Sequence, residues 1–245
     1  MLSHDMITDE LVHLSIERPV AEHIAPVMAR YVDELYRGND RFGLISREDA
    51  ADPQRLLRRH ILDSIAPWRI VADLLETSGR RRLFDLGSGA GLPGIPLASV
   101  LSHARPGILD EVVLVERRSK RVAFLLGVLP GLRRAGGDAP VANIRALEVD
   151  TAHLPTREPN PLSDAAVVFR AYHQTSEELL MQLARVFGPA APVCALKGKT
   201  EQTQAELHLL HASPHADGGE IHSVAVPGDT AERSVLTWYT AEDTR

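Results

Sequence analysis

The chain has 245 residues, of which 44% are apolar and 24% are charged. These values are typical of a soluble globular protein, and they leave room for one α/β domain with an appendage but hardly for two full domains. No apolar run approaches the roughly 18 to 20 residues that a membrane span needs, and the N-terminus lacks a basic stretch followed by an apolar one. We therefore expect no membrane partner and a cytoplasmic location.

The net charge of −6 argues against a general polyanion binder, but it hides an asymmetry along the chain. Residues 51–134 carry 14 Lys and Arg against 8 Asp and Glu, while the remainder carries 13 against 25. Solvated helix faces would explain any one of the basic clusters, but four in one third of the chain suggest an anionic partner. The four clusters are Arg55, Arg58 and Arg59; Arg80, Arg81 and Arg82; Arg117, Arg118, Lys120 and Arg121; and Arg133 and Arg134.

The single cysteine, Cys194, lies in the apolar segment APVCAL. It cannot form an internal disulfide and has no second cysteine for a metal site, so we predict a small buried side chain. The histidine-containing segment 211–222 is too irregular for a metal site and is predicted to be a loop. We expect no bound metal.

The first 78 residues are predicted to be an N-terminal extension without strands. Residues 1–18 form a segment that can be flexible, and residues 19–78 form a helical part. Apolar residues recur at steps of three and four between residues 19 and 36, which predicts a docking helix. A second helical run covers residues 54–76, and Pro67 predicts a break near Ala66.

Residues 79–245 are predicted to be the main domain. Short apolar runs alternate there with helical segments, which implies right-handed crossovers and a mostly parallel sheet. The last two runs are separated only by the turn-prone 227–232, so they should pair antiparallel. The seven predicted strands are 83–86, 112–116, 143–149, 165–169, 191–197, 220–226 and 234–240.

Three glycines, Gly87, Gly89 and Gly91, alternate directly after the first strand and before a helix. Such a loop turns sharply, lets the backbone approach a ligand closely and presents N–H groups to a nucleotide-like molecule. Gly89, Gly91 and Gly94 also match the dinucleotide fingerprint G-x-G-x-x-G, which is weak evidence by itself. An NAD-dependent oxidoreductase is therefore one alternative.

Two carboxylates flank the glycine loop. Asp85 stands two residues before Gly87, where a pyrophosphate would gain nothing from a negative charge but the ammonium and sulfonium groups of S-adenosylmethionine would. Glu116 ends the second strand, where an acid can accept both ribose hydroxyls of an adenosine, unless it is merely a solvent-exposed strand end. The loop and these acids predict S-adenosylmethionine as the cofactor.

The chain resembles the RsmG or GidB family of bacterial small-subunit ribosomal RNA methyltransferases, which modify guanine N7. The glycine pattern is common to many methyltransferases, whereas GLPGIPL joined to an upstream RHILDS is far more specific. The resemblance covers about residues 20–240, and it implies a Rossmann-like class I methyltransferase fold, α/β, with an antiparallel last strand. The motifs that carry it are RHILDS at 59–64, DLGSGAGLPGIPL at 85–97, KRVAFL at 120–125, FRA at 169–171 and LKG at 196–198.

The resemblance implies donor contacts at Gly87 and Leu92 in the glycine loop, at Thr151 and Ala152 after the third strand, and at Arg170 in FRA. The chain departs from the family at two places. Phe169 stands where a small polar residue is usual, and Asp150 stands near a position where an arginine is frequent.

Methylation at guanine N7 would be a direct displacement by an in-plane lone pair, so no general base is required and no catalytic residue is predicted. Catalysis would come from holding the base in line with the transferred methyl group. Arg58, Arg59, His60 and Lys197 are predicted to contact ribosomal RNA or the small ribosomal subunit. We expect a monomer.

Three alternatives remain at this point. A paralogue with the same fold could methylate a small molecule or another acceptor, as the acidic remainder of the chain and the two departures would allow. The NAD-dependent oxidoreductase and a non-enzymatic RNA-binding module are the others.

Overall fold

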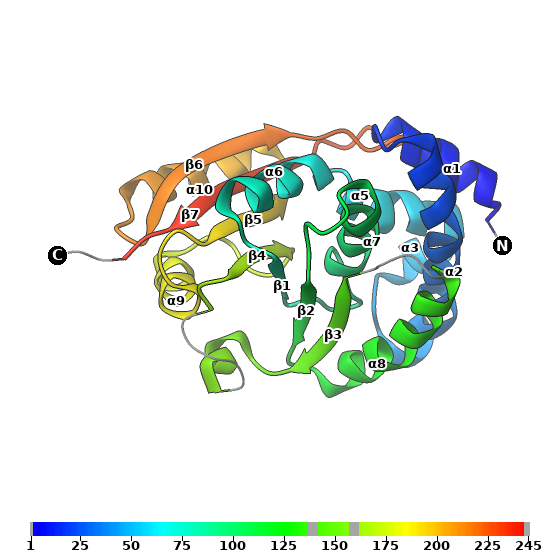
Figure 1. Ribbon diagram of the computed structural model, residues 1–245, viewed down its shortest axis with the longest axis horizontal. Coiled ribbons are helices and arrows are strands. Elements are labelled where there is room, and N and C mark those ends of the chain that lie inside the picture. The colour runs from blue at the N-terminus through cyan, green and yellow to red at the C-terminus, as the bar shows by residue number, and fades with distance from the viewer. Residues whose placement is uncertain (1, 137–141, 157–161, 243–245) are drawn as a thin grey trace.

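A computed structural model describes residues 2–136, 142–156 and 162–242. A seven-stranded sheet crosses the middle of the molecule in the order β3-β2-β1-β4-β5-β7-β6 (Figure 1). Strands β1 to β5 are parallel, β7 is antiparallel to β5, and β6 is antiparallel to β7. The predicted sheet is confirmed, including the antiparallel last pair. The strands are β1 Arg82–Leu86, β2 Glu111–Glu116, β3 Asn143–Glu148, β4 Ala165–Arg170, β5 Pro192–Lys197, β6 Ala216–Ser223 and β7 Ser234–Thr240.

Both faces of the sheet are buried, because apolar side chains on one strand alternate between two cores. In β1, Leu83 belongs to the core beneath the N-terminal helices, while Phe84 and Leu86 belong to the core beneath α9. The helices of the main domain are α7 Gly94–Ala104, α8 Ser119–Ala135, η2 Thr151–Thr156, α9 Glu177–Phe187 and α10 Thr200–Ala212.

The N-terminal helices share the first of these cores with the sheet. Tyr31, at 0% exposure, donates a 2.6 Å hydrogen bond from its hydroxyl to the carbonyl of Ala90 in the glycine loop. The extension is therefore part of the structure that shapes this loop. Its helices are α1 His4–His13, α2 Arg18–Phe42, α3 Arg47–Ala50, α4 Pro53–Leu56, the π-helical turn η1 Leu57–Leu62, α5 Asp63–Ile65 and α6 Trp68–Ser78.

Helix α1 was not among the predicted elements. The side chain of Ser3 caps it by accepting a hydrogen bond from the backbone N–H of Met6, and Ile7 and Leu11 are fully buried against the N-terminal core. The predicted break at Pro67 is confirmed, since α5 ends at Ile65 and α6 begins at Trp68.

Strand β6 begins four residues before its predicted start. Gly218 and Gly219 have φ values of +70° and +145°, and the pairing with β7 shifts its register between Asp217 and Glu220. Glycines at a bulge weaken the local strand pattern, so residues predicted to lie in a loop pair with β7 instead. The connection from β6 to β7 runs back toward α1 (Figure 1), and Val226 is buried in the N-terminal core.

None of the helices within the described part of the chain combines the length and the apolar character needed to cross a membrane.

Candidate active site

The glycine loop leaves β1 at the carboxyl edge of the sheet, and its glycines are required by close contacts. Gly87 has φ +66°, and a Cβ there would lie 2.2 Å from the ring of Tyr172. Gly91 has φ +97°, and a Cβ there would lie 2.4 Å from Ile95. Any larger residue would therefore meet both backbone strain and a steric clash at these positions.

Asp85 is fully buried beneath the loop and holds its shape. One carboxylate oxygen, Oδ2, accepts hydrogen bonds from Ser88 Oγ at 2.7 Å and from the N–H of Gly94 at 2.9 Å. The other oxygen, Oδ1, is buried without a hydrogen-bond partner among the described residues. Burial raises the pKa of Asp85 to about 6. A cation next to Oδ1 would offset the free-energy cost of ionising this buried carboxyl group.

Glu116 is also buried, with 4% of its surface exposed, at the end of β2. Its Oε2 accepts a hydrogen bond from the N–H of Gly89 at 3.0 Å, and its Oε1 accepts one from the N–H of Arg118 at 2.9 Å. The guanidinium of Arg121 lies 3.6 Å from Oε2. The carboxylate is thus fixed against the glycine loop by backbone donors and one cation.

A cavity of about 250 Å³, which we call the donor cavity, lies between the start of the glycine loop and Glu116. Gly87, Glu116 and Thr151, all predicted donor contacts, lie in its wall. Asp150, noted above as a departure from the family pattern, lies there too. The wall consists of Gly87, Val115, Glu116, Arg117, Arg118, Arg121, Val149, Asp150, Thr151, Ala171, Tyr172 and His173.

Tyr172 closes one side of the donor cavity, and the sequence did not single it out. Its ring lies directly on the α-carbon of Gly87. The preceding residue, Ala171, has φ +50°, a conformation that L residues seldom adopt outside functional sites and turns. With the ring in this position the cavity is smaller than the roughly 300 to 1,000 Å³ of most ligand sites.

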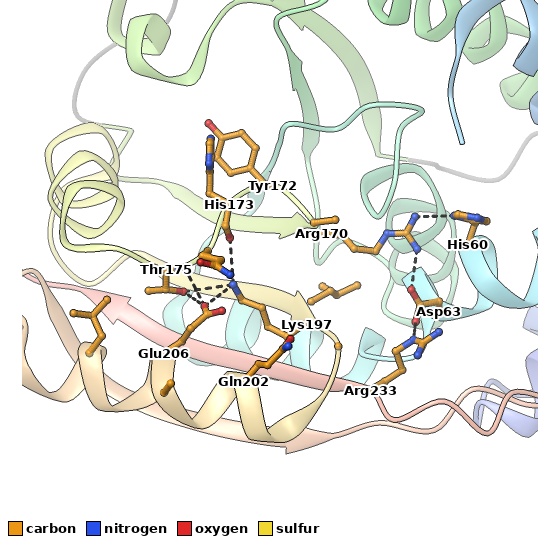
Figure 2. Close-up of a pocket in the computed structure, with 16 residues that line it drawn as sticks. His60, Asp63, Arg170, Tyr172, His173, Thr175, Lys197, Gln202, Glu206 and Arg233 are labelled. Carbon is orange, nitrogen blue, oxygen red and sulfur yellow. Dashed lines mark hydrogen bonds and ion pairs between the residues drawn. The ribbon is translucent and has the colours of Figure 1, made fainter. Parts of the chain in front are cut away.

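A second and larger cavity, of about 940 Å³, lies beside the donor cavity and shares Ala171, Tyr172 and His173 with it. We call it the acceptor cavity. Figure 2 shows two groups of polar side chains at opposite sides of it, one around Lys197 and Glu206 and one around Arg170 and Asp63.

Asp63 links three segments of the chain at one side of the acceptor cavity (Figure 2). Its Oδ2 lies 2.8 Å from Nη1 of Arg170 at the end of β4, and its Oδ1 lies 2.6 Å from Nε of Arg233. A second nitrogen of Arg170, Nη2, lies 3.1 Å from Nδ1 of His60. Burial and the neighbouring Arg170 lower the pKa of His60, so its ring is neutral near pH 7.

Lys197 lies at the other side of the acceptor cavity and is largely buried. Its Nζ lies 2.6 Å from Oε2 of Glu206 and 3.3 Å from the carbonyl oxygen of His173, to which it donates. The ammonium also lies 5.6 Å from the ring centroid of Phe169. Its charge is therefore balanced within the protein. No three His, Cys, Asp or Glu side chains of the described residues gather to hold a metal ion.

A family model described as rRNA small subunit methyltransferase G matches residues 24–235. The chain belongs to this family. Relatives named "Ribosomal RNA small subunit methyltransferase G" include one from Stenotrophomonas maltophilia (strain R551-3), 40% identical over 87% of this chain and 86% of the relative. Another, from Anaeromyxobacter sp. (strain Fw109-5), is 31% identical over 90% of each chain. The resemblance found in the sequence is thereby confirmed.

Among solved structures, the O-methyltransferase from Bacillus cereus in complex with SAH has a TM-score of 0.52 and is 12% identical, over 86% of this chain and 90% of that one. This likeness shows the class I methyltransferase fold. Membership of the rRNA small subunit methyltransferase G family makes the chain an S-adenosylmethionine-dependent methyltransferase, so the oxidoreductase and the non-enzymatic module are both set aside.

For this methyltransferase the structure divides the predicted donor contacts into three groups. Gly87, Glu116 and Thr151 lie in the wall of the donor cavity. Arg170 lies in the wall of the acceptor cavity and is paired with Asp63. The others lie in neither wall and are Asp85, Gly89, Gly91, Leu92 and Ala152.

The predicted RNA contacts are also divided. His60 and Lys197 lie in the acceptor cavity. Arg58 and Arg59 are not part of its wall: Arg58 pairs with Glu10 of α1 at 2.9 Å, and Arg59 lies 3.4 Å from Asp49. The signal that sequence analysis missed was the aromatic pair after FRA, Tyr172 and His173, because a pair of rings has no periodicity or spacing that marks a site.

Proposed function

We propose that this methyltransferase transfers the methyl group of S-adenosylmethionine to N7 of a guanine in small-subunit ribosomal RNA. The observation that carries the proposal is the pair of cavities at the carboxyl edge of the sheet, which share the wall formed by Ala171, Tyr172 and His173. A donor in one cavity and a base in the other would meet at this wall. The names of the relatives support ribosomal RNA as the acceptor.

The residues of the donor cavity fit the proposed cofactor. Glu116 offers carboxylate oxygens to ribose hydroxyls, and the bare α-carbon of Gly87 allows a ligand to approach the backbone. Asp85 lies behind the glycine loop and outside the cavity wall, where its unpartnered Oδ1 would stabilise an ammonium or sulfonium group that came next to it. When bound, S-adenosylmethionine supplies a methyl group activated by its positively charged sulfur.

The acceptor cavity fits a reaction that needs no general base. Guanine N7 reacts through an in-plane lone pair and has no proton to lose. Positive charge passes to the purine during transfer, so an uncompensated cation at the reacting edge would oppose the reaction. Here Arg170 and Arg233 are balanced by Asp63 and Asp229, Lys197 is paired with Glu206, and His60 is neutral near pH 7. The chain's contribution would be to orient the base.

The proposal is tested by mass spectrometry of small-subunit ribosomal RNA from a strain that lacks this gene. We expect one 7-methylguanosine to disappear and to return when the wild-type gene is restored, but not when the Glu116→Gln variant is restored. Unchanged methylation of every nucleotide would refute ribosomal RNA as the substrate. A loss of methylation at another guanine atom would refute only the N7 assignment.

A ribosomal RNA substrate would place the enzyme in the cytoplasm, as the sequence analysis expected.

A further inference from the structure

The basic clusters differ in whether their charges are already balanced. Arg55 and Arg59 pair with acids on the α3 helix, and Arg58 pairs with Glu10. In the second cluster, Arg81 lies 2.6 Å from Asp110 and Arg82 lies 2.9 Å from Glu111. These charges are neutralised within the protein, so they contribute little to the attraction of a polyanion.

Position in the sheet separates the clusters further. The second cluster is at the amino end of β1, because β1 begins at Arg82, whereas both cavities lie at the carboxyl ends of the strands. The fourth cluster lies at the C-terminal end of α8, about 22 Å from the start of the helix at Ser119 at 1.5 Å per residue. Neither can reach a molecule seated over the acceptor cavity.

Three exposed cations remain at the carboxyl edge. Arg118 and Lys120 follow β2 beside the donor cavity, and Lys199 follows β5 beside the acceptor cavity. Among the described residues, Arg118 and Lys120 have no ion-pair partner. Lys199 forms no direct ion pair, although Glu232, which accepts a hydrogen bond from the N–H of Thr200, lies near enough to interact with its charge. In the sheet order, β1 and β4 separate β2 from β5, so the two groups stand about 14 Å apart at ~4.8 Å per strand.

We propose that Arg118, Lys120 and Lys199 bind the phosphates of a single RNA strand that crosses the carboxyl edge of the sheet from β2 to β5. The proposal rests on the proposed function. Phosphates on both sides of the target nucleotide would be held, and the nucleotide between them would lie over the cavities. A base inside a duplex cannot enter a cavity of this kind, so the target must be unpaired or extruded from its helix.

The chemistry favours RNA over an acidic protein surface. The cations lie on opposite sides of two cavities whose shared wall carries the aromatic rings of Tyr172 and His173, 4.4 Å apart between centroids. Aromatic side chains stack on unpaired bases. An acidic peptide has no bases, so these rings favour RNA as the partner.

The test is the salt dependence of RNA binding by the full chain, measured by fluorescence anisotropy with an unmodified small-subunit ribosomal RNA fragment. Each phosphate contact contributes about −0.7 to the slope of log affinity against log salt concentration for a single strand. We expect Lys120→Gln and Lys199→Gln each to reduce the slope by about that amount and the triple variant with Arg118→Gln to reduce it by about 2. A single-stranded RNA of scrambled sequence should show the same losses, because phosphate contacts carry no sequence information.

Arg134→Gln is the matched control, because Arg134 is exposed on α8 but lies far from the carboxyl edge. It should leave the slope unchanged. Equal losses in Arg134→Gln and Lys120→Gln would show that the charge of the whole surface matters, and would overturn the proposal. An unchanged slope in Lys199→Gln would overturn the crossing from β2 to β5. Competition by polyglutamate as effective as competition by RNA would indicate an acidic protein partner instead.

The affinities of Lys120→Gln and Lys199→Gln for S-adenosylhomocysteine are measured by calorimetry and should equal that of the wild type, because neither residue lies in the wall of the donor cavity. Failure of the proposed function has a different signature. In that case the wild-type chain would transfer no methyl group to ribosomal RNA, whatever the salt slopes of the variants.

Discussion

Asp85 has a carboxylate whose ionisation the fold opposes by burial. Its pKa is raised from an ordinary 3.8 to about 6, so the folded chain holds this proton more tightly than the unfolded chain. The stability that Asp85 contributes is therefore fully present below pH 3.8 and is lost as the pH rises through about 6. Asparagine does not ionise. We therefore expect the free energy of unfolding of Asp85→Asn, relative to that of the wild type, to rise by about 3 kcal/mol between pH 4 and pH 7, at roughly 1.4 kcal/mol per pKa unit.

Urea unfolding of both proteins at several pH values measures this difference in free energy. Groups that titrate in the same way in both proteins do not contribute to the difference. A constant difference across the range would show that Asp85 ionises normally. The proposed contact with a cationic donor adds a second expectation, since the wild type should bind S-adenosylmethionine more tightly as the pH rises through about 6. Asp85→Asn should lose this dependence.

Tyr172 is the other residue on which the donor cavity depends. A donor that uses the backbone of Gly87 has to displace this ring. We expect Tyr172→Ala to bind S-adenosylhomocysteine on the order of fivefold more tightly, since the variant no longer has to give up the packing contacts of the ring, which contribute about 1 kcal/mol. Calorimetry is the measurement.

Tyr36→Ala, which removes a half-exposed tyrosine on α2, is the matched control and should bind as the wild type does. Weaker binding by Tyr172→Ala would mean that the ring is a contact for the donor and not an obstacle to it.

At the scale of elements, Asp63 joins α5 to the end of β4 and to the residue before β7. It is 13% exposed and accepts hydrogen bonds from Arg170 and Arg233. Removing its charge leaves two partly buried guanidinium groups without that carboxylate, which costs about 3 kcal/mol for a well-buried network. We expect Asp63→Asn to lower the free energy of unfolding by about 2 to 3 kcal/mol, measured by urea unfolding.

The comparison variant is Asp9→Asn, because Asp9 pairs with Arg18 at 3.0 Å but both side chains are more than half exposed. Exposed pairs contribute at most about 1 kcal/mol, so its effect should be small. Equal losses in the two variants would show that the Asp63 network is no more than a surface contact.

At the scale of the whole molecule, donor binding should stabilise the complete fold, because the donor cavity is built from segments that follow β1, β2, β3 and β4. S-adenosylhomocysteine at a concentration 100-fold above its dissociation constant raises the free energy of unfolding by about 2.7 kcal/mol. In a chain of this length, this corresponds to a rise in melting temperature of about 5 to 10 °C. Differential scanning calorimetry should show that rise with S-adenosylhomocysteine and none with NAD. An equal rise with NAD would contradict the donor assignment.

Local patterns were sufficient for the order of strands and helices. Alternating apolar runs after residue 79 marked the seven strands, Pro67 marked the helix break, and the spacing of Gly87, Gly89 and Gly91 marked the ligand loop. Each of these features depends on neighbours within a few residues, so it is visible in the linear chain. Helix α1 and the start of β6 were missed, because the first is held by tertiary packing and the second by pairing with β7 across a glycine bulge.

Packing alone decided which residues meet at the site. Arg170 lies 107 positions from its partner Asp63, and Tyr172 covers a glycine 85 positions earlier in the chain. The same holds for the basic clusters, which look alike in the chain but lie at opposite ends of the sheet or are paired with acids from other elements. Side-chain contacts of this kind depend on the order and direction of the strands and on which charged residues pack beside one another. Neither can be inferred from a local pattern of residues.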